Sequence, residues 1–228
     1  MKLDKTSLNP GEIGSFPQAD GINHKIKFNI GEIEEREAPL YGLLLPPEPI
    51  MNKKAKFTTL LSVAAINDTR YLVLTISFIE FLKTFTTGGF ETWPLRVHHK
   101  NGISEEYELF RLIMSSDKKY VNFKASTFSI GEISAIYDSS TKRTPVYING
   151  YNEYRDYKEK LYNTGEMMLY DDLIVDLTNC QEDILKFSYT IEGYVVSERL
   201  KHAIEEKGFT GMAFKEISEV DQRIKVIY

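Results

Sequence analysis

Apolar side chains recur with helical spacing in the first half of the chain, directly after a run typical of a strand. Residues 70–74 are β-prone, and Thr75 or Ser77 is a suitable N-cap because its hydroxyl can accept a hydrogen bond from the first helical turn. The apolar positions that follow have the i, i+3, i+4, i+7 spacing of one buried helical face: Phe78, Phe81, Leu82 and Phe85. Gly88 and Gly89 end the pattern, so we predict a strand followed by a helix.

The same succession of signals returns near the end of the chain. Residues 194–196 are typical of a strand, and Ser197 follows as a candidate N-cap with Glu198 in the first helical turn. Gly208 lies where a C-terminal glycine stop is expected, and residues 212–217 are again typical of a strand. The predicted buried face of the helix consists of Leu200, Ala203 and Ile204.

The two patterns superimpose. Placing Thr75 over Ser197 aligns three apolar pairs: Phe78 with Leu200, Phe81 with Ala203, and Leu82 with Ile204. The chain is therefore predicted to contain two strand–helix–strand units. An internal duplication and an independent likeness both remain open, because all such units share these local signals.

The middle of the chain alternates between strand-like runs and one charged helical pattern. Residues 91–99 and 105–114 flank the turn sequence Lys100-Asn101-Gly102, which predicts an antiparallel hairpin. We also predict strands at 120–125, 132–137 and 173–177, and a surface helix at 151–162. The predicted class is α+β, a mostly antiparallel sheet with two or three packed helices and repeated strand–helix–strand units.

Glycine and proline are concentrated before residue 50, which favours short strands and loops. Brief strands are expected at 28–30 and 40–45. We accordingly predict a Gly/Pro-rich N-terminal region over 1–60 and an α+β domain over 61–228, with a single continuous domain as the alternative.

Composition narrows the classes of function. The 228 residues have a formal net charge of −5, which argues against a general nucleic-acid binder. Cys180 is the one cysteine, so no internal disulfide is expected. The N-terminus lacks a signal-peptide pattern, and the apolar region 57–82 is interrupted by Asp68 and Arg70, so no membrane association is expected. The expected location is the cytoplasm.

Motifs for catalysis are missing from the sequence. It has neither a phosphate-binding glycine loop nor a Gly-x-Ser-x-Gly nucleophile elbow. His98 and His99 are adjacent on a predicted strand, so their side chains point to opposite faces and are poorly placed to share a metal. Acidic neighbours disfavour a reactive thiolate at Cys180. We expect no enzymatic activity, no metal and no cofactor.

The residues with most promise for binding lie between positions 151 and 172. The side-chain types are those of interface hot spots, aromatic and guanidinium groups, together with paired carboxylates: Tyr151, Tyr154, Arg155, Tyr157, Asp171 and Asp172. We predict these as partner-binding residues. The alternative is structural: the tyrosines cover the protein's own sheet, and the aspartates occupy a turn that enters a strand.

The last predicted strand–helix–strand unit has a distinctive amino-acid sequence. Val195-Val-Ser-Glu-Arg-Leu200 is followed by Glu205-Glu-Lys-Gly-Phe-Thr-Gly211 and Phe214-Lys-Glu-Ile217. This unit resembles the end of a family of immunity proteins that accompany toxins in bacterial polymorphic and contact-dependent toxin systems. The likeness extends over roughly residues 71–217, and Trp93-Pro-Leu-Arg-Val97 looks like the start of the family's central hairpin.

The resemblance implies a non-enzymatic immunity protein that binds and neutralises a cognate toxin domain. The matching residues form caps, turns and apolar faces, so no binding residue is transferred from the family. Two other hypotheses remain: a general interaction or scaffold protein of the same fold, and an enzyme with an unrecognised site that uses Asp171, Asp172 or His98.

Overall fold

The computed structural model describes residues 3–5, 19–21, 48–53, 55–62, 71–132, 142–161, 164–191 and 193–228. The chain forms two compact units, the first from Met1–Ser115 with Gln181–Glu216, the second from Ser116–Cys180 with Ile217–Tyr228. Strands dominate and are mostly antiparallel, which confirms the predicted α+β class. The strands expected at 28–30 and 40–45 lie outside the described residues, as do residues 133–137.

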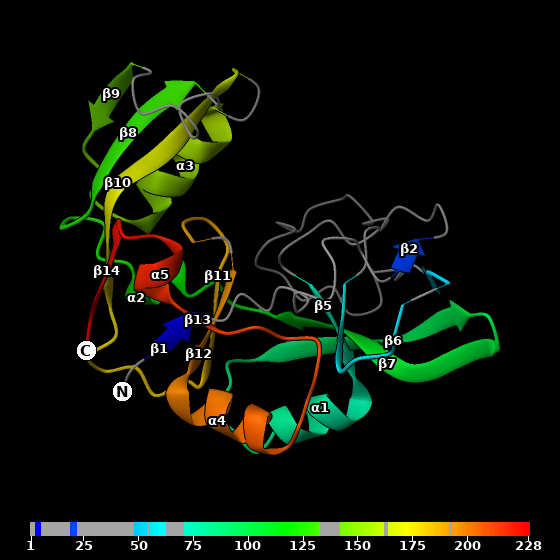
Figure 1. The fold of residues 1–228 in the computed structure, drawn as a ribbon. Helices are drawn as coiled ribbons and strands as arrows, with labels where there is room; N and C mark the ends of the chain where they lie inside the picture. Colours follow the sequence, from blue (N-terminus) through cyan, green and yellow to red (C-terminus); the bar gives the residue numbers. More distant parts are fainter. Residues whose placement is uncertain are drawn as a thin grey trace. The chain divides into compact units, whose positions relative to one another are not determined.

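The described part of the first unit contains two sheets and two helices (Figure 1). One sheet has the order β2-β3-β6-β7-β5-β4 and the other β11-β12-β1-β13. The strands are β1 (Leu3–Lys5), β2 (Ala19–Gly21), β3 (Pro49–Met51), β4 (Leu60–Leu61), β5 (Leu72–Thr75), β6 (Phe90–His99), β7 (Gly102–Leu112), β11 (Ile184–Phe187), β12 (Gly193–Ser197) and β13 (Lys215–Glu216). The helices are α1 (Ile76–Leu82) and α4 (Glu198–Glu206).

The predicted strand–helix–strand repeat is present, and the two copies share one topology. In the first copy, β5, α1 and β6 follow one another, and β7 lies between β5 and β6 in the sheet. In the second copy, β12, α4 and β13 follow one another, and β1 lies between β12 and β13. An antiparallel edge strand completes each copy, β4 on β5 and β11 on β12. The second copy therefore takes its fourth strand from the N-terminus of the chain.

The two copies also share their register. One rung of the first sheet joins Leu60, Leu74, Glu108 and Pro94. One rung of the second joins Ile184, Val196, Asp4 and Glu216. The superposition that places Thr75 over Ser197 also places Leu74 over Val196 and Pro94 over Glu216, so the likeness extends from the helices across the whole ladder.

Reciprocal hydrogen bonds join the two copies. The segment after α1 reaches the start of β11, where the N–H of Thr86 donates to Asp183 Oδ2 at 2.9 Å. The segment after α4 reaches the start of β4, where the N–H of Thr210 donates to Thr59 Oγ1 at 3.1 Å. The acceptor residues are equivalent, because the Thr59 carbonyl accepts from the Thr75 N–H and the Asp183 carbonyl accepts from the Ser197 N–H.

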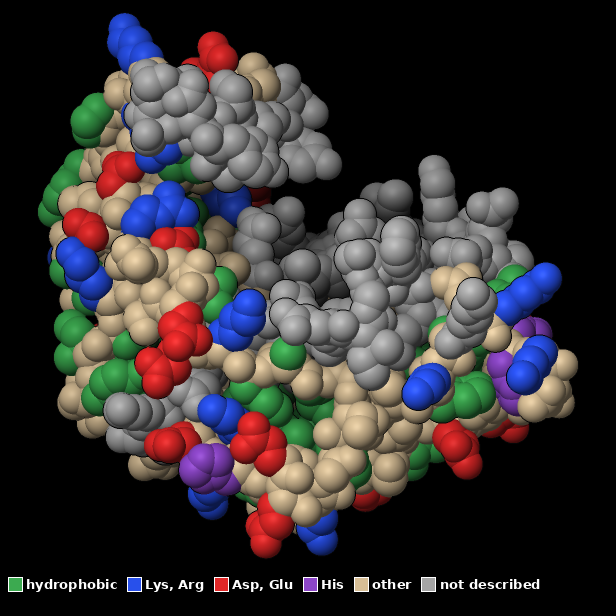
Figure 2. Space-filling view, viewed as in Figure 1, with side chains coloured by type: hydrophobic (Ala, Val, Ile, Leu, Met, Phe, Trp, Pro, Cys, Tyr) green, Lys and Arg blue, Asp and Glu red, His purple; other side chains and the backbone are tan. Residues whose placement is uncertain are grey.

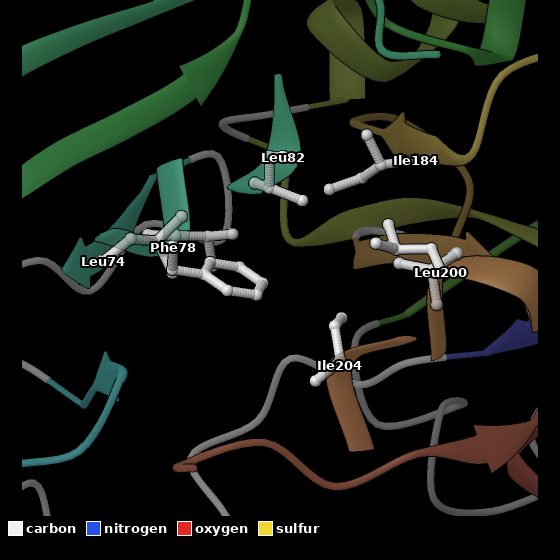
Figure 3. A pocket seen from close by; sticks show the side chains of 8 residues that line it. Leu74, Phe78, Leu82, Ile184, Leu200 and Ile204 are labelled. Atoms are coloured by element: carbon white, nitrogen blue, oxygen red, sulfur yellow. The ribbon is translucent and has the colours of Figure 1, made fainter. Parts of the chain in front are cut away.

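A shared apolar core lies between the copies. Both helices and strands from both sheets contribute to it, and Figure 3 shows side chains from both copies converging on one point. The narrow gap at this point is lined by Leu72, Leu74, Phe78, Leu82, Ile184, Val196, Leu200 and Ile204. It has no room for a water molecule, so we interpret it as packed core.

The caps and ends of the helices agree with the sequence in part. Ser197 is the N-cap of α4, since its Oγ accepts from the Leu200 N–H at 3.1 Å. Thr75 is the N-cap of α1, but its side chain makes no capping hydrogen bond. Helix α1 ends at Leu82, before the glycine pair that was expected to stop it. The predicted strand at 212–217 is only two residues long.

The second unit is a four-stranded sheet, in the order β14-β10-β8-β9, with α3 packed on it. Its strands are β8 (Thr127–Glu132), β9 (Arg143–Val146), β10 (Glu166–Asp176) and β14 (Ile224–Ile227). Its helices are α2 (Asp117–Tyr120), α3 (Tyr151–Leu161) and α5 (Ile217–Val220). The two four-residue helices, α2 and α5, were not expected from the sequence.

The strand predicted at 120–125 was wrong. Helix α2 ends at Tyr120, and Val121 makes only an isolated bridge to Val175. Asn122 then holds a turn, because its side-chain Oδ1 accepts from the Ala125 N–H at 3.2 Å and its carbonyl accepts from Ser126 Oγ at 2.8 Å. A local side-chain hydrogen bond of this kind competes with strand pairing.

Candidate functional site

The distal end of the β6–β7 hairpin presents the candidate interaction surface. The hairpin extends beyond α1 (Figure 1), and its turn uses Gly102 at a φ of 135°, a conformation that favours glycine. Along β6, the side chains of Trp93, Leu95 and Val97 are buried, while Pro94 and Arg96 are exposed. The strand alternation therefore places His98 on the outer face.

One rung of three strands forms the centre of this surface. His98 pairs with Ile50 of β3 on one side and with Ile103 of β7 on the other. Directly paired residues have side chains on the same face, so two isoleucines flank the imidazole. Each isoleucine is 43% exposed. An apolar pair of this kind, left in water, gains free energy when a partner covers it.

Ion pairs surround the apolar pair. Glu48 contacts two basic side chains, His98 Nε2 at 2.5 Å and Arg96 Nη1 at 3.4 Å. The Nε of Arg96 lies 3.6 Å from Glu105 Oε1 on β7. We call these six residues, Glu48, Ile50, Arg96, His98, Ile103 and Glu105, the distal hairpin surface. An apolar centre with an arginine and a charged rim is the usual composition of a protein-binding surface.

The opposite face of the hairpin tip has an aromatic cluster. The Phe57 ring is stacked on Tyr107 at 6.0 Å and meets His99 edge-on at 5.0 Å. His98 and His99 thus have separate neighbours on opposite faces. Figure 2 shows histidine, basic and hydrophobic side chains together at this tip. Within the described ranges, no three His, Cys, Asp or Glu side chains are grouped to hold a metal ion.

Two of the predicted binding residues lie in the core of the second unit. Tyr154 is 1% exposed, and its ring lies 5.4 Å from Phe123 and 5.0 Å from Phe128. Tyr151 is also buried, 6.3 Å from the Phe123 ring. These tyrosines cover their own sheet, as the structural alternative states, so we withdraw both from the predicted partner-binding set.

The other predicted residues remain at the surface. Arg155 lies near two acidic residues of its own helix, Asp156 at 3.8 Å and Glu159 at 3.7 Å. Tyr157 is half-buried, with the Lys160 ammonium 5.8 Å from its ring centroid. Both stay predictions as partner-binding residues.

The two aspartates on β10 are paired within the chain. Asp171 accepts a hydrogen bond from Arg143 of β9 at 3.2 Å, and Asp172 lies 2.7 Å from the Lys225 ammonium of β14. Their negative charge is therefore largely balanced, and they offer a basic partner less attraction than the sequence indicates. Their role in binding also stays a prediction.

Sequence reasoning missed a buried charged cluster around Asp183. This carboxylate is 1% exposed and accepts hydrogen bonds from Ser197 Oγ at 2.6 Å, Arg199 Nε at 3.1 Å and the Thr86 N–H. Arg199 Nη2 contacts it as well, and the guanidinium lies 5.2 Å from the Phe85 ring.

Electrostatics fix the charge state of this cluster. Burial by itself raises the pKa of Asp183, but hydrogen bonds from Arg199, Ser197 and the Thr86 N–H outweigh burial and hold the pKa below its usual value. The pKa of Arg199 is raised by the same pairing. The carboxylate is thus ionised and fully engaged in joining the two copies of the repeat, which makes the cluster a structural element.

No protein-family model and no curated protein sequence matches this chain. No helix in the described parts of the chain combines the length and apolar character that crossing a bilayer requires. The functional inference below therefore starts from the surfaces of the molecule and from the sequence resemblance.

Proposed function

We propose that this protein is a non-enzymatic immunity protein that binds a cognate bacterial toxin domain in the cytoplasm and neutralises it stoichiometrically. The observation that supports a binding role is the distal hairpin surface, with its exposed apolar rung beside the ion pairs of Arg96 with Glu48 and Glu105. The sequence resemblance over roughly residues 71–217 supports the kind of partner.

The distal hairpin surface suits reversible recognition of a folded protein. Full burial of an isoleucine side chain stabilises a complex by about 1.5–3 kcal/mol, so covering the exposed parts of Ile50 and Ile103 contributes roughly half of that for each. Arg96 can exchange its exposed ion pair with Glu105 for a carboxylate of the partner. Opposite charges on the rim fix the orientation of the toxin domain.

Neutralisation in this proposal needs no chemistry from the immunity protein. The bound hairpin blocks the active site of the toxin or a surface that the toxin requires. One molecule protects against one toxin domain, and protection depends on the relative amounts of the two proteins.

Co-expression tests the proposal. The protein is produced with the C-terminal domain of whichever large secreted protein is encoded beside its gene, and growth and co-purification are measured; lack of any such neighbour would also count against the immunity proposal. Rescue with a one-to-one complex is the expected result. Continued killing by the toxin domain, with the protein folded and abundant, would overturn the immunity proposal.

A matched pair of variants tests the surface. Ile103→Glu should abolish rescue, because it introduces a charge into the apolar rung. Ile76→Glu is the control, since Ile76 is 41% exposed at the start of α1. Equal rescue by both variants, at equal protein level, would exclude the distal hairpin surface as the toxin-binding site.

A further inference from the structure

The β5–β6–β7 sheet has a row of polar side chains on the face opposite to the distal hairpin surface. This row lies next to an apolar cluster that includes Val73 and Leu109. Arg111 of β7 pairs directly with Glu91 of β6. Tyr71, which precedes β5, lies beside Arg111, since the next residue along, Leu72, pairs with Phe110.

Within the described residues, the buried guanidinium of Arg111 has no acceptor for either of its terminal amino groups. Its side chain is among the largest fully buried ones, with 2% of the residue exposed. Neither Nη1 nor Nη2 has a hydrogen-bond partner among the residues that the structure describes. The guanidinium lies 5.8 Å from the Tyr71 ring centroid, a contact that stabilises a cation but satisfies none of its N–H groups.

Trp93 adds a second donor to the same place. It is 4% exposed, and its Nε1 likewise has no partner in the described part of the chain. Trp93 pairs with Leu109, two residues from Arg111 on β7, so the two side chains are diagonal neighbours on one face. Both also contact the Tyr71 ring, which lies 6.4 Å from the Trp93 ring.

These groups can only donate hydrogen bonds. Buried donors that lack a hydrogen-bond acceptor destabilise a fold, so the arrangement calls for an acceptor. Glu91 is the nearest acidic residue in register, and no hydrogen bond from the two Arg111 Nη groups to it is present among the described residues.

We propose that Arg111 and Trp93 form a binding site for a small carboxylate. The two Nη groups match the two oxygens of a carboxylate in a bidentate pair, and the indole N–H offers a further donor to one of those oxygens. A single negative charge balances the single guanidinium, whereas a phosphate dianion would leave a buried charge uncompensated. The aromatic rings of Tyr71 and Trp93 favour a ligand with an apolar body.

This inference is independent of the proposed immunity function. The side chains of Arg111 and Trp93 lie on the sheet face opposite to Ile50, His98 and Ile103. A carboxylate at this site stabilises the sheet from which the hairpin extends, with or without a toxin partner.

Ligand-dependent thermal unfolding of the full chain is the first test. Sodium acetate and sodium benzoate are compared with sodium chloride at equal ionic strength, and acetamide and benzamide serve as uncharged analogues. We expect the carboxylates to raise Tm with saturation, by on the order of 5 °C at a hundred times Kd. A rise no larger than that with chloride, or an equal rise with the amides, would overturn the proposal.

Variants distinguish binding of an external carboxylate from an acceptor that the protein itself supplies. Trp93→Phe keeps an aromatic ring but removes the indole N–H donor, and should weaken carboxylate binding severalfold. Arg111→Met should abolish the carboxylate-dependent shift. If Arg111→Met does not fold, the wild-type and Trp93→Phe titrations still decide. Glu91→Gln should leave the carboxylate-dependent shift in Tm intact. The opposite result has two parts: the shift is missing from the wild type, and the effects of Glu91→Gln and Arg111→Met on stability couple in a double-mutant cycle. In that case Glu91 is the acceptor and the proposal is wrong.

Discussion

The N-cap residues of the two repeated helices should differ sharply in their contribution to stability. Ser197 is fully buried, and its hydroxyl both caps α4 and donates to Asp183 Oδ1 at 2.6 Å. Thr75 occupies the equivalent position, but its hydroxyl does not cap α1 and, among the described residues, interacts only with the exposed Ser77 hydroxyl at 3.1 Å. The pair offers a test and a control at matched positions of one fold.

The magnitude follows from the two hydrogen bonds. Loss of an N-cap costs about 1 kcal/mol, and loss of a hydrogen bond to a charged group costs about 1.5–3 kcal/mol. Asp183 keeps its contacts with Arg199 and the Thr86 N–H, so no further penalty for an unpaired carboxylate is expected. Ser197→Ala should therefore reduce the free energy of unfolding by about 2–4 kcal/mol, and Thr75→Ala by less than about 1 kcal/mol.

Urea unfolding monitored by circular dichroism measures both values, and the slope of each transition shows whether unfolding remains two-state. Asp183→Asn, alone and combined with Ser197→Ala, separates capping from the buried hydrogen bond through a double-mutant cycle. Equal losses in Ser197→Ala and Thr75→Ala would refute the reasoning, because the buried bond to Asp183 would then contribute nothing.

Two further predictions concern a glycine and an acid-sensitive ion pair. Gly211→Ala should destabilise the fold by more than about 3 kcal/mol in thermal unfolding, since Gly211 has a φ of 87° and an added Cβ would clash with the Leu60 carbonyl. Gly208→Ala is the control: Gly208 has a φ of 70° with open space around it, so this change should cost only about 1 kcal/mol. Burial opposes ionisation of Asp221, but hydrogen bonds from Arg223 and Tyr170 prevail and lower its pKa to about 2. Its stabilising contribution is complete above an unfolded-state pKa of about 4 and is lost as the pH falls towards 2. In Asp221→Asn, the free energy of unfolding should therefore depend less on pH over this range than in the wild type, as followed by tyrosine fluorescence.

Local signals predicted the repeated units well. The spacing of apolar residues located both helices, and the Ser197 cap and the hairpin turn before Gly102 were read correctly from residue type. These features depend on residues within a few positions of each other, so a single sequence is sufficient to find them. The α+β class followed from their sum.

Features that depend on residues distant in sequence escaped prediction. Asp183 in one copy of the repeat accepts a hydrogen bond from the Thr86 N–H in the other, and no local sequence pattern indicates that contact. Tyr154 has the residue type of an interface but packs on Phe123 and Phe128, because amphipathic spacing does not distinguish a core face from a binding face. The distal hairpin surface needs the pairing of Ile50 with His98, which joins separate parts of the chain.

The N-terminal strand gives the two copies of the repeat different routes of assembly. The first copy builds its four-stranded ladder from one continuous stretch, Leu60 to Leu112, so pairing of its strands closes only short loops. The second copy has β1 between β12 and β13, and must close a loop that includes nearly the whole chain. Because such long-range closure is slow, we expect the first copy to fold early and to template the second, with insertion of β1 as the final step. Until that step, β12 and β13 both present open edges, and β1 from a second molecule can fill the same slot to give a strand-swapped dimer.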